Sequence, residues 1–439
     1  MPKYNTDIDA SQGIKTDATE SEKAGKIAEK KKAALKTAEI AENTVTKKAL
    51  DIDEAGGEVV SQPFMTDKTV QRIRGCSSWA VFATPADFGK YKKTDGFVCK
   101  CALCPVCMSY QSRRDALRLV AVLGGAEDLR SLEESLVGKL YGADFLEKDK
   151  KAKQAHASGV RYVAMTLTTV NVRGRDLAGE VKKYARDFDN FIRDYESRDK
   201  TKHNGLQFDY PQILGYVRKL EVTYNKQEKI TEQMWEGAGK YNSPGKYKYM
   251  RMGLKIGSKN PDRDTYHPHY HVLLAVTPDF LRRDEKGRLR AALSEDELLA
   301  RWRQATGDSR ITQVKLQIIK SLREGDKVDS ALMEIAKYVA KDADYLHSPE
   351  VFKVFYQALK GCKRMVFGGI LRAFNRLFRE KKLERYIPPD TADYKWLVRF
   401  AWAKDFYVEL EKEREELTEE KAAEIRGMRY DEANDTEDF

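Results

Sequence analysis

The chain has 439 residues, and 41% of them are hydrophobic, which is enough for a buried core and for two or three domains. No apolar run approaches the roughly 20 residues that cross a bilayer, and no secretory signal is present, so we expect a cytoplasmic protein with no membrane partner. The net charge of +10 is uneven, because residues 1–70 carry −2, residues 409–439 carry −8 and residues 71–408 carry +20. This excess favours nucleic acid as a partner, although an ordinary lysine-rich surface would give the same charge.

The first two segments of the chain differ in composition. Residues 1–70 are rich in Ala, Lys and Glu and poor in aromatic side chains, which predicts a disordered charged arm. Residues 71–125 contain five of the six cysteines, followed by a helical pattern. Four thiolates suit a tetrahedral structural zinc ion, with Cys101 as an alternative to Cys99. The predicted zinc ligands are Cys76, Cys99, Cys104 and Cys107.

Residues 155–350 alternate between strand and helix patterns, and we expect them to form a catalytic domain. Apolar residues recur with the period of strands or of helices in the order β-α-β-β-α-β-α. This succession predicts an α+β fold with a ferredoxin-like core, in which helices cover one face of an antiparallel sheet. A polar insertion, residues 226–265, separates the two middle strands. We expect a helical C-terminal extension over residues 351–408 and an acidic tail over residues 409–439.

Three histidines stand two residues apart in the second middle strand. The strand period puts His267, His269 and His271 on one face, where imidazoles can chelate a cation. Glu221 lies in the neighbouring strand among hydrophobic residues, where a carboxylate needs a cation. We predict that His269, His271 and Glu221 bind a catalytic Mg²⁺ or Mn²⁺, although the imidazoles would also accept Zn²⁺. A polar sheet face without a metal, and a salt bridge from Glu221 to a lysine, are the alternatives.

The last predicted helix, residues 329–346, has three polar side chains on one face. Glu334, Tyr338 and Lys341 stand at i, i+4 and i+7, and they supply a base, a nucleophile and a cation. A tyrosine hydroxyl with a pKa near ~10 is a weak nucleophile, but a metal can polarise a phosphate and a nearby cation can favour the phenolate. Many helices have such a face by chance, so the pairing with the histidine strand is what makes it a candidate site.

Together these motifs resemble the rolling-circle plasmid replication initiators of the HUH endonuclease superfamily, named for a histidine, a hydrophobic residue and a histidine. The resemblance runs from about Cys76 to Leu377, and its pieces in chain order are CPVC, AMTLTTVN, KLEVTYN, HPHYHVLLAV, EIAKYVAK and RMVFGG. It implies that His269 and His271 are the paired histidines and that Tyr338 becomes joined to a 5′-phosphate. It also implies that Glu334, four residues before the tyrosine, activates water for the terminating cleavage.

The resemblance implies a DNA-nicking enzyme that acts on single-stranded DNA at a plasmid's double-strand origin. The 5′-phosphotyrosyl intermediate would leave a free 3′-hydroxyl for replication, and a host helicase and DNA polymerase are the implied partners. We expect Arg113 and Arg114, in the helix after the cysteines, to hold the DNA backbone. Two other functions stay open: a relaxase or transposase of the same superfamily, and a non-catalytic zinc-containing DNA-binding regulator.

Overall fold

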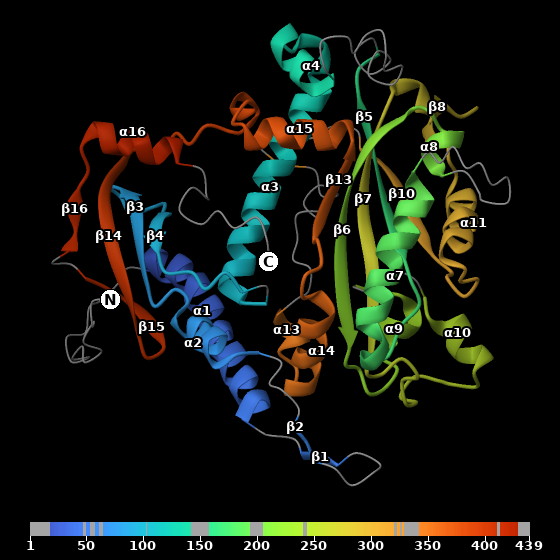
Figure 1. Cartoon of the computed structure of the whole chain (residues 1–439), viewed down its shortest axis with the longest axis horizontal. Helices are drawn as coiled ribbons and strands as arrows, with labels where there is room; N and C mark the ends of the chain where they lie inside the picture. The colour runs from blue at the N-terminus through green and yellow to red at the C-terminus, as the bar shows by residue number, and fades with distance from the viewer. Residues whose placement is uncertain are drawn as a thin grey trace.

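The main sheet of the computed structural model has five antiparallel strands. They are β5 (Arg161–Thr168), β6 (Ile213–Asn225), β7 (Thr265–Val276), β10 (Val314–Ile319) and β13 (Met365–Gly369). Their order across the sheet is β10-β5-β7-β6-β13 (Figure 1). The first four strands agree with the predicted segments, so the α+β class and the antiparallel sheet are confirmed. The structure describes residues 18–46, 50–52, 58–60, 65–101, 103–141, 158–193, 205–239, 244–319, 323–324, 327–328, 342–410 and 413–428.

One face of the main sheet is covered by three helices. They are α7 (Gly174–Ile192), α11 (Glu295–Thr306) and α14 (Pro349–Leu359). Apolar residues of α7 recur every three or four positions, so one side of this helix packs against the sheet. The hydroxyl of Ser294 accepts a hydrogen bond from the backbone N–H of Glu297, which fixes the start of α11 as its capping signature predicts.

The opposite face of the main sheet is covered as well, which corrects the expectation of helices on one face only. Helices α3 (Pro105–Glu127) and α15 (Ile370–Arg379) pack there, against Leu273 of β7 among others. Both helices come from outside the segment that predicted the ferredoxin-like order. The central strands show little two-residue alternation between buried and exposed side chains, because both of their faces are buried.

A second antiparallel sheet joins two distant parts of the chain. Its strands β3 (Trp79–Pro85), β4 (Lys92–Gly96), β14 (Tyr394–Ala403) and β15 (Phe406–Glu409) lie in the order β15-β14-β3-β4. The short strand β16 (Glu415–Glu416) also pairs with β14. The predicted helical extension over 351–408 is therefore wrong in part, since β13 and β14 lie within it. Part of the predicted acidic tail is packed too: helix α16 (Glu419–Gly427) buries Ala422 and Ile425.

Helix α1 (Ala18–Thr46) corrects the prediction of a disordered arm over residues 1–70. It contacts α2 (Asp67–Gly75), α3 and α14. Ala34, Ala38 and Ala41 are buried and stand at i, i+4 and i+7, so they form a flat face that lets other elements approach closely. Residues 1–17 lie outside the described part of the chain.

The remaining elements are short. They are β1 (Leu50–Ile52), β2 (Glu58–Val60), α4 (Glu134–Tyr141), α8 (Leu206–Asp209), α9 (Glu232–Glu236), α10 (Lys246–Arg251), β8 (Leu281–Arg283), β9 (Leu289–Ala291), β11 (Arg323–Glu324), β12 (Lys327–Val328) and α13 (Asp342–Tyr345), with 3₁₀ turns at Leu129–Ser131, Pro278–Phe280 and Glu384–Tyr386. Of the predicted helix 329–346, the structure describes only residues 342–346. A search of the described helices finds none with the length and apolar character of a membrane span.

Candidate metal centres

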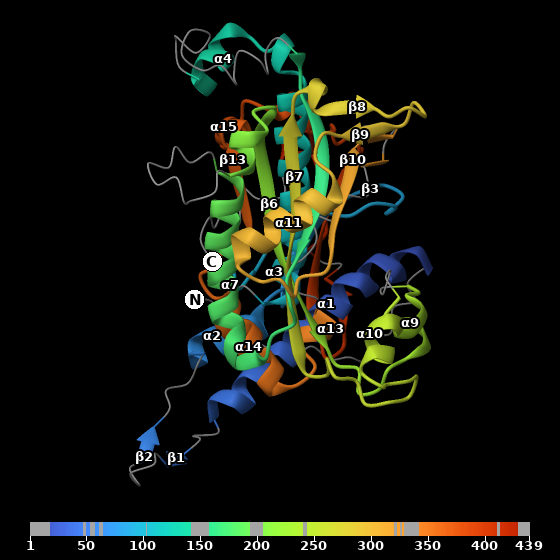
Figure 2. The same cartoon turned by 90° about the vertical axis from the view of Figure 1, so that its right-hand side faces the viewer.

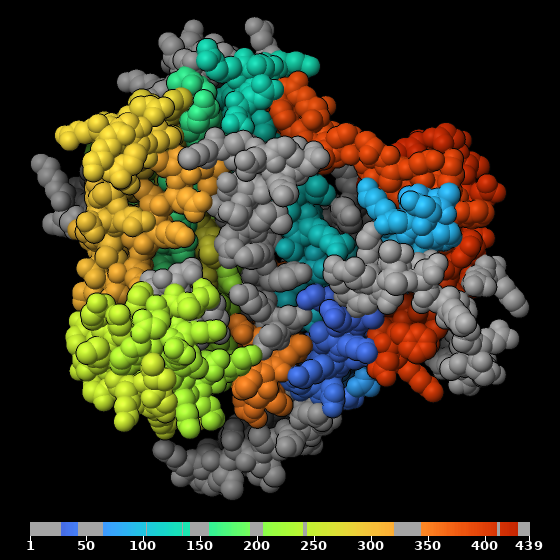
Figure 3. Space-filling model, turned by 180° about the vertical axis from the view of Figure 1, so that it is seen from behind, coloured from blue at the N-terminus to red at the C-terminus, as the bar shows by residue number. Residues whose placement is uncertain are grey.

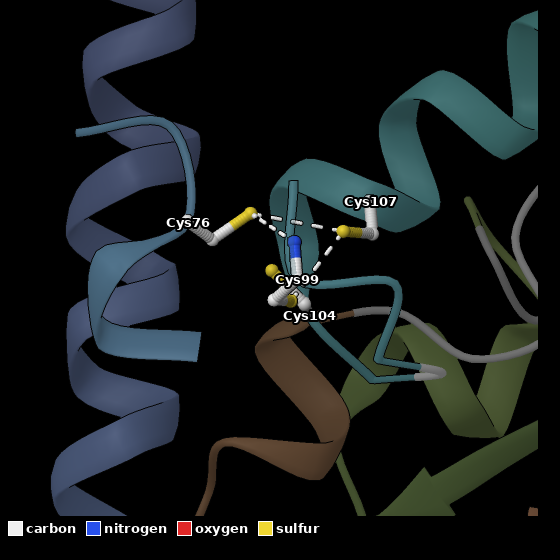
Figure 4. Close-up of side chains that lie close together, drawn as sticks. All are labelled: Cys76, Cys99, Cys104 and Cys107. Atoms are coloured by element: carbon white, nitrogen blue, oxygen red, sulfur yellow. Dashed lines mark hydrogen bonds between the residues drawn. The ribbon is translucent and has the colours of Figure 1, made fainter. Parts of the chain in front are cut away.

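Four cysteine thiols converge where α2, β4 and α3 meet (Figure 4). Cys76 is the C-cap residue that follows α2, and Cys99 follows β4. Cys104 caps the N-terminus of α3 and Cys107 lies in its first turn. Pro105 occupies the first helical position, which proline favours. Because Cys104 and Cys107 stand three residues apart, their thiols lie on the same side of this first turn.

The spacing of these four thiols, which we call the cysteine group, fits a tetrahedral metal. All four Sγ atoms lie within 4.8 Å of one another. The Sγ atom of Cys107 is 3.7 Å from that of Cys76 and 3.5 Å from that of Cys99. Tetrahedral zinc, with Zn–S bonds of about 2.3 Å, holds its sulfur atoms about 3.8 Å apart. The structure thus brings together the four cysteines that the sequence analysis selected, and Cys101 is not among them.

The thiols of the cysteine group perturb one another. Burial raises the pKa of Cys104 well above its usual value. Hydrogen bonds from Cys104, and then from Cys76 and Cys99, hold the pKa of Cys107 well below its usual value. A bound cation would favour loss of the remaining protons, because metals bind thiolates rather than thiols.

Two lysines with buried ammonium groups flank the cysteine group, and the sequence analysis missed both. Lys31 of α1 donates hydrogen bonds to the carbonyl oxygens of Arg74 and Cys76, each at 2.7 Å. The ammonium of Lys93 in β4 lies 4.4 Å from the centroid of the Tyr110 ring. Burial lowers the pKa of each lysine, and the cysteines partly offset that shift. Four thiolates around a divalent ion leave an excess of negative charge, which two nearby ammonium groups would offset. Nothing in the lysine-rich sequence sets Lys31 apart from its neighbours.

A second group of potential ligands lies on the paired strands β6 and β7. Glu221 is directly opposite His269 in the strand register, and His271 lies two residues further along the same face. The Oε2 atom of Glu221 is 3.0 Å from Nε2 of His271 and 3.4 Å from Nε2 of His269. Neighbouring ligand atoms of a six-coordinate ion, with bonds of about 2.1 Å, stand about 3 Å apart. These three residues, the Glu-His group, therefore fit a divalent cation.

Glu221 is a carboxylate in this setting. Burial alone would raise its pKa, but hydrogen bonds and charge from His269 and His271 outweigh burial and hold the pKa below its usual value. The alternative was a salt bridge between Glu221 and a lysine. Lys219, two residues earlier in β6, does not form it. Lys219 instead pairs with Asp115 at 3.0 Å.

His267 lies on the same strand but outside the Glu-His group. Its Nε2 atom is 3.0 Å from the carbonyl oxygen of Thr169. Burial and the charge of His269 lower the pKa of His267 to about 4, so its ring is neutral and can donate to that carbonyl. The carbonyl oxygen of His267 lies 3.3 Å from Nδ1 of His269. A hydrogen bond there would leave Nε2 of His269 free to bind a cation, so His267 would orient a ligand rather than act as one.

Comparison with known proteins shows that the part of the chain containing the Glu-His group matches a protein family. A model of a replication protein family matches residues 141–393, more than half of the chain. The chain belongs to the replication protein (Rep) family. The matched region contains β6 and β7 and therefore the whole Glu-His group, whereas the cysteine group precedes it.

Curated relatives of this Rep protein come from several bacteria. A protein named rep from Staphylococcus aureus is 29% identical over 274 residues, which cover 62% of this chain and 82% of the relative. Rep proteins from Streptococcus pneumoniae and Bacillus amyloliquefaciens are 21% and 24% identical, over 72% and 70% of this chain and 73% of each relative. No solved structure matches the chain. The family and these relatives identify a plasmid replication initiator.

Helix α3 connects the two ligand groups of this Rep protein. It begins at the cysteine group, and two turns beyond Cys107 it carries Asp115. Asp115 forms a buried ion pair with Lys219, which lies opposite His271 in the register and two residues before Glu221. None of the sequence patterns indicated this pair, because each partner is an ordinary polar residue of a helix or a strand.

The two arginines predicted to bind DNA lie on the same helix. Arg113 is exposed. Arg114 donates a hydrogen bond to Gln111 at 2.7 Å, and Gln111 in turn donates to Asp115 at 3.0 Å. The position of Arg113 leaves it accessible to a ligand, whereas Arg114 is part of the network around the buried ion pair.

The predicted nucleophile helix falls outside the described residues. Glu334, Tyr338 and Lys341 all lie in the segment 329–341, of which the structure describes nothing. Helix α13 follows immediately and contacts β6, the strand that carries Glu221. The chain therefore returns to the strand of the Glu-His group directly after these three residues.

Proposed function

We propose that this replication initiator is a metal-dependent nicking and closing enzyme of the HUH endonuclease type, acting on single-stranded DNA of a plasmid's double-strand origin. The observation that carries the proposal is the convergence of Glu221, His269 and His271, whose ligand atoms lie within 4.8 Å of one another. Three ligands leave positions at which a phosphate oxygen could bind a cation. Membership of the Rep family favours replication over a relaxase, a transposase or a non-catalytic regulator.

In the proposed reaction, the hydroxyl oxygen of Tyr338 attacks the phosphorus of the scissile phosphate. The phosphorus–oxygen bond to the 3′-oxygen breaks, a 5′-phosphotyrosyl bond forms, and the departing oxygen takes up a proton to become the 3′-hydroxyl. A Mg²⁺ or Mn²⁺ ion bound by the Glu-His group would stabilise the negative charge that develops on the phosphate. Lys341 favours the phenolate of Tyr338, and Glu334 accepts a proton from the water that attacks in the terminating cleavage.

The cysteine group has a structural role in this proposal. Four cysteines complete a tetrahedral zinc site and leave no position for a substrate. The ion would hold the start of α3 against the end of α2 and the segment after β4. Arg113 and Arg114, with the basic middle of the chain, would hold the DNA backbone. A host helicase would separate the strands, and a host DNA polymerase would extend the freed 3′-hydroxyl.

The test is a search for a covalent protein–DNA adduct. The full-length protein is incubated with Mn²⁺ and a labelled single-stranded origin oligonucleotide, and the adduct is resolved on a denaturing gel. We expect an adduct with the wild type and none with Tyr338→Phe. Tyr356→Phe removes a hydroxyl from a tyrosine of α14 and should leave the adduct unchanged. An adduct of wild-type yield in Tyr338→Phe would overturn the assignment of the nucleophile.

A further inference from the structure

The described residues of the insertion between β6 and β7 fold into a small lobe with its own core, which we call the β6–β7 lobe (residues 226–239 and 244–264). Ile230, Met234 and Tyr249 form that core around α9 and α10. Backbone hydrogen bonds between Ile230 and residues 257 and 258 close the base of the lobe. Figure 2 shows both helices beside the lower ends of β6 and β7, and Figure 3 shows the lobe in yellow-green as a rounded projection. The lobe is thus a built feature and not a loose loop.

The outward surface of the β6–β7 lobe is unusually apolar. Tyr247 and Met250 are 66% and 61% exposed, and Met252 and Ile256 are 50% and 48% exposed. These four are half of the eight large hydrophobic side chains that are exposed among the described residues. They lie within ten residues and take no part in the core of the lobe. Such a concentration marks a surface that binds something.

The same surface is basic. Residues 245–259 contain five lysines and arginines and no acidic residue. Lys246 and Lys248 have carboxylate partners within the lobe. Arg251, Lys255 and Lys259 are exposed and have no carboxylate partner in the described part of the chain. Cations beside an exposed aromatic ring and apolar side chains suit single-stranded DNA, because the cations meet phosphates while the ring and the apolar groups meet bases.

The strands that carry the Glu-His group also position the lobe. Glu221 pairs with His269, and the strand pairing continues for four more residues to Asn225 and Thr265, where the lobe begins. At about 3.4 Å per residue the base of the lobe lies roughly 14 Å from the Glu-His group. A stacked DNA strand covers that distance in about four nucleotides.

We propose that the outward surface of the β6–β7 lobe binds the single-stranded DNA that flanks the scissile phosphate. The contact residues are Tyr247, Met250, Arg251, Met252, Lys255 and Ile256. This inference rests on the proposed nicking function, since it takes the Glu-His group as the position of the scissile phosphate. The lobe contributes binding of the flanking strand and takes no part in bond breaking.

The test compares two single-stranded origin oligonucleotides with full-length, metal-loaded protein. The short one covers only the nick site, and the long one extends about ten nucleotides, roughly 34 Å of stacked strand, to each side. We expect Tyr247→Ala to bind the long oligonucleotide roughly 5- to 150-fold more weakly, and to nick the short one at the wild-type rate. Arg251→Ala should reduce the slope of log affinity against log salt by about 0.7. Phe406→Ala removes a ring that is 55% exposed on β15 and is the matched control, with no expected effect.

The outcomes separate this proposal from the nicking function. If Tyr247→Ala and Arg251→Ala bind the long oligonucleotide as tightly as the wild type does, the proposed role of the lobe is overturned. The proposed nicking function would not be affected by that result. A wild-type protein that nicks neither oligonucleotide would overturn the proposed function, while the binding comparison would still decide the role of the lobe. The binding measurement is repeated with the long oligonucleotide after its flanks have been made double-stranded. If the variants lose affinity only for that substrate, the assignment to single-stranded DNA is overturned.

Discussion

The cysteine group and the Glu-His group differ in enclosure and in the number of ligands they offer. The cysteines come from residues 76–107 and are all buried, with α1 and two lysines around them. Glu221 and the two histidines come from separate strands, and the histidine side chains are 12% and 13% exposed. Closed sites with four ligands stabilise folds, whereas sites with three ligands keep a position for substrate. We therefore expect damage to the first group to cost stability and damage to the second to cost activity.

We expect the largest effect from a substitution in the cysteine group, which should destabilise the whole protein. Cys104→Ser should lose the bound metal and lower the free energy of unfolding by about 5 kcal/mol or more, because binding of a structural metal contributes directly to folding. Metal analysis of the purified protein and thermal unfolding measure the two losses. Cys101→Ser is the matched control and should keep the metal, since Cys101 is not in the group. Equal metal loss in both variants would show that the ligand set is wrong.

Asp115→Ala tests the connection between the two groups. It leaves the buried ammonium of Lys219 without its carboxylate, which should cost about 3–5 kcal/mol in unfolding free energy. The double variant Asp115→Leu with Lys219→Met should recover much of this loss, because two apolar side chains can replace a buried ion pair. Denaturant unfolding of the wild type and of these variants gives the comparison. If the double variant is no more stable than Asp115→Ala, the unpaired ammonium of Lys219 is not the cause of the lost stability.

His269→Ala tests the Glu-His group in the way that Cys104→Ser tests the cysteine group. It should reduce adduct formation at least about 100-fold, while the melting temperature and the metal content of the cysteine group stay near wild type. His267→Ala, on the same strand and face, is the control and should keep most of the activity, because it removes no member of the group and retains the backbone carbonyl that faces Nδ1 of His269. Loss of the structural metal in His269→Ala would show that the two groups are not independent.

The smallest expected effect comes from Asp390, which precedes β14 of the second sheet. Burial would raise the pKa of Asp390, but hydrogen bonds from Lys90, Lys92 and Tyr394 lower it to about 2. This value lies below the unfolded value of about 3.9, so Asp390 stabilises the protein above about pH 4 and the stabilisation is lost as the pH falls towards 2. Asp390→Asn should cost about 1–2 kcal/mol at pH 7 and much less at pH 2, measured by denaturant unfolding. An equal cost at both pH values would contradict this account.

Short-range patterns in the sequence predicted much of the main sheet and of both ligand groups. Two-residue periodicity placed His269 and His271 on one face, and that face depends only on local backbone geometry. The cysteine spacing around Pro105 likewise depends on one helical turn. The partner strand of β7 was also predictable, because a polar insertion separates two strong strand patterns.

Long-range contacts were not predictable in the same way. Strand β14 pairs with β3, more than 300 residues earlier, and no local pattern specifies such a partner. Strand β13 has five residues, two of them glycine, which is too short for a clear period. Helix α1 has a composition typical of disorder, and only the spacing of Ala34, Ala38 and Ala41 shows that it has a packing face.

The most direct test of the central claim is identification of the residue that becomes joined to DNA. The adduct formed with Mn²⁺ is digested with nuclease and trypsin, and the peptide that retains a nucleotide is sequenced by mass spectrometry. Trypsin releases Tyr338–Lys341 as a peptide with a single tyrosine. The account predicts that this peptide carries the 5′-phosphate and that His269→Ala yields almost none of it. A nucleotide attached to any other peptide would contradict the proposed mechanism.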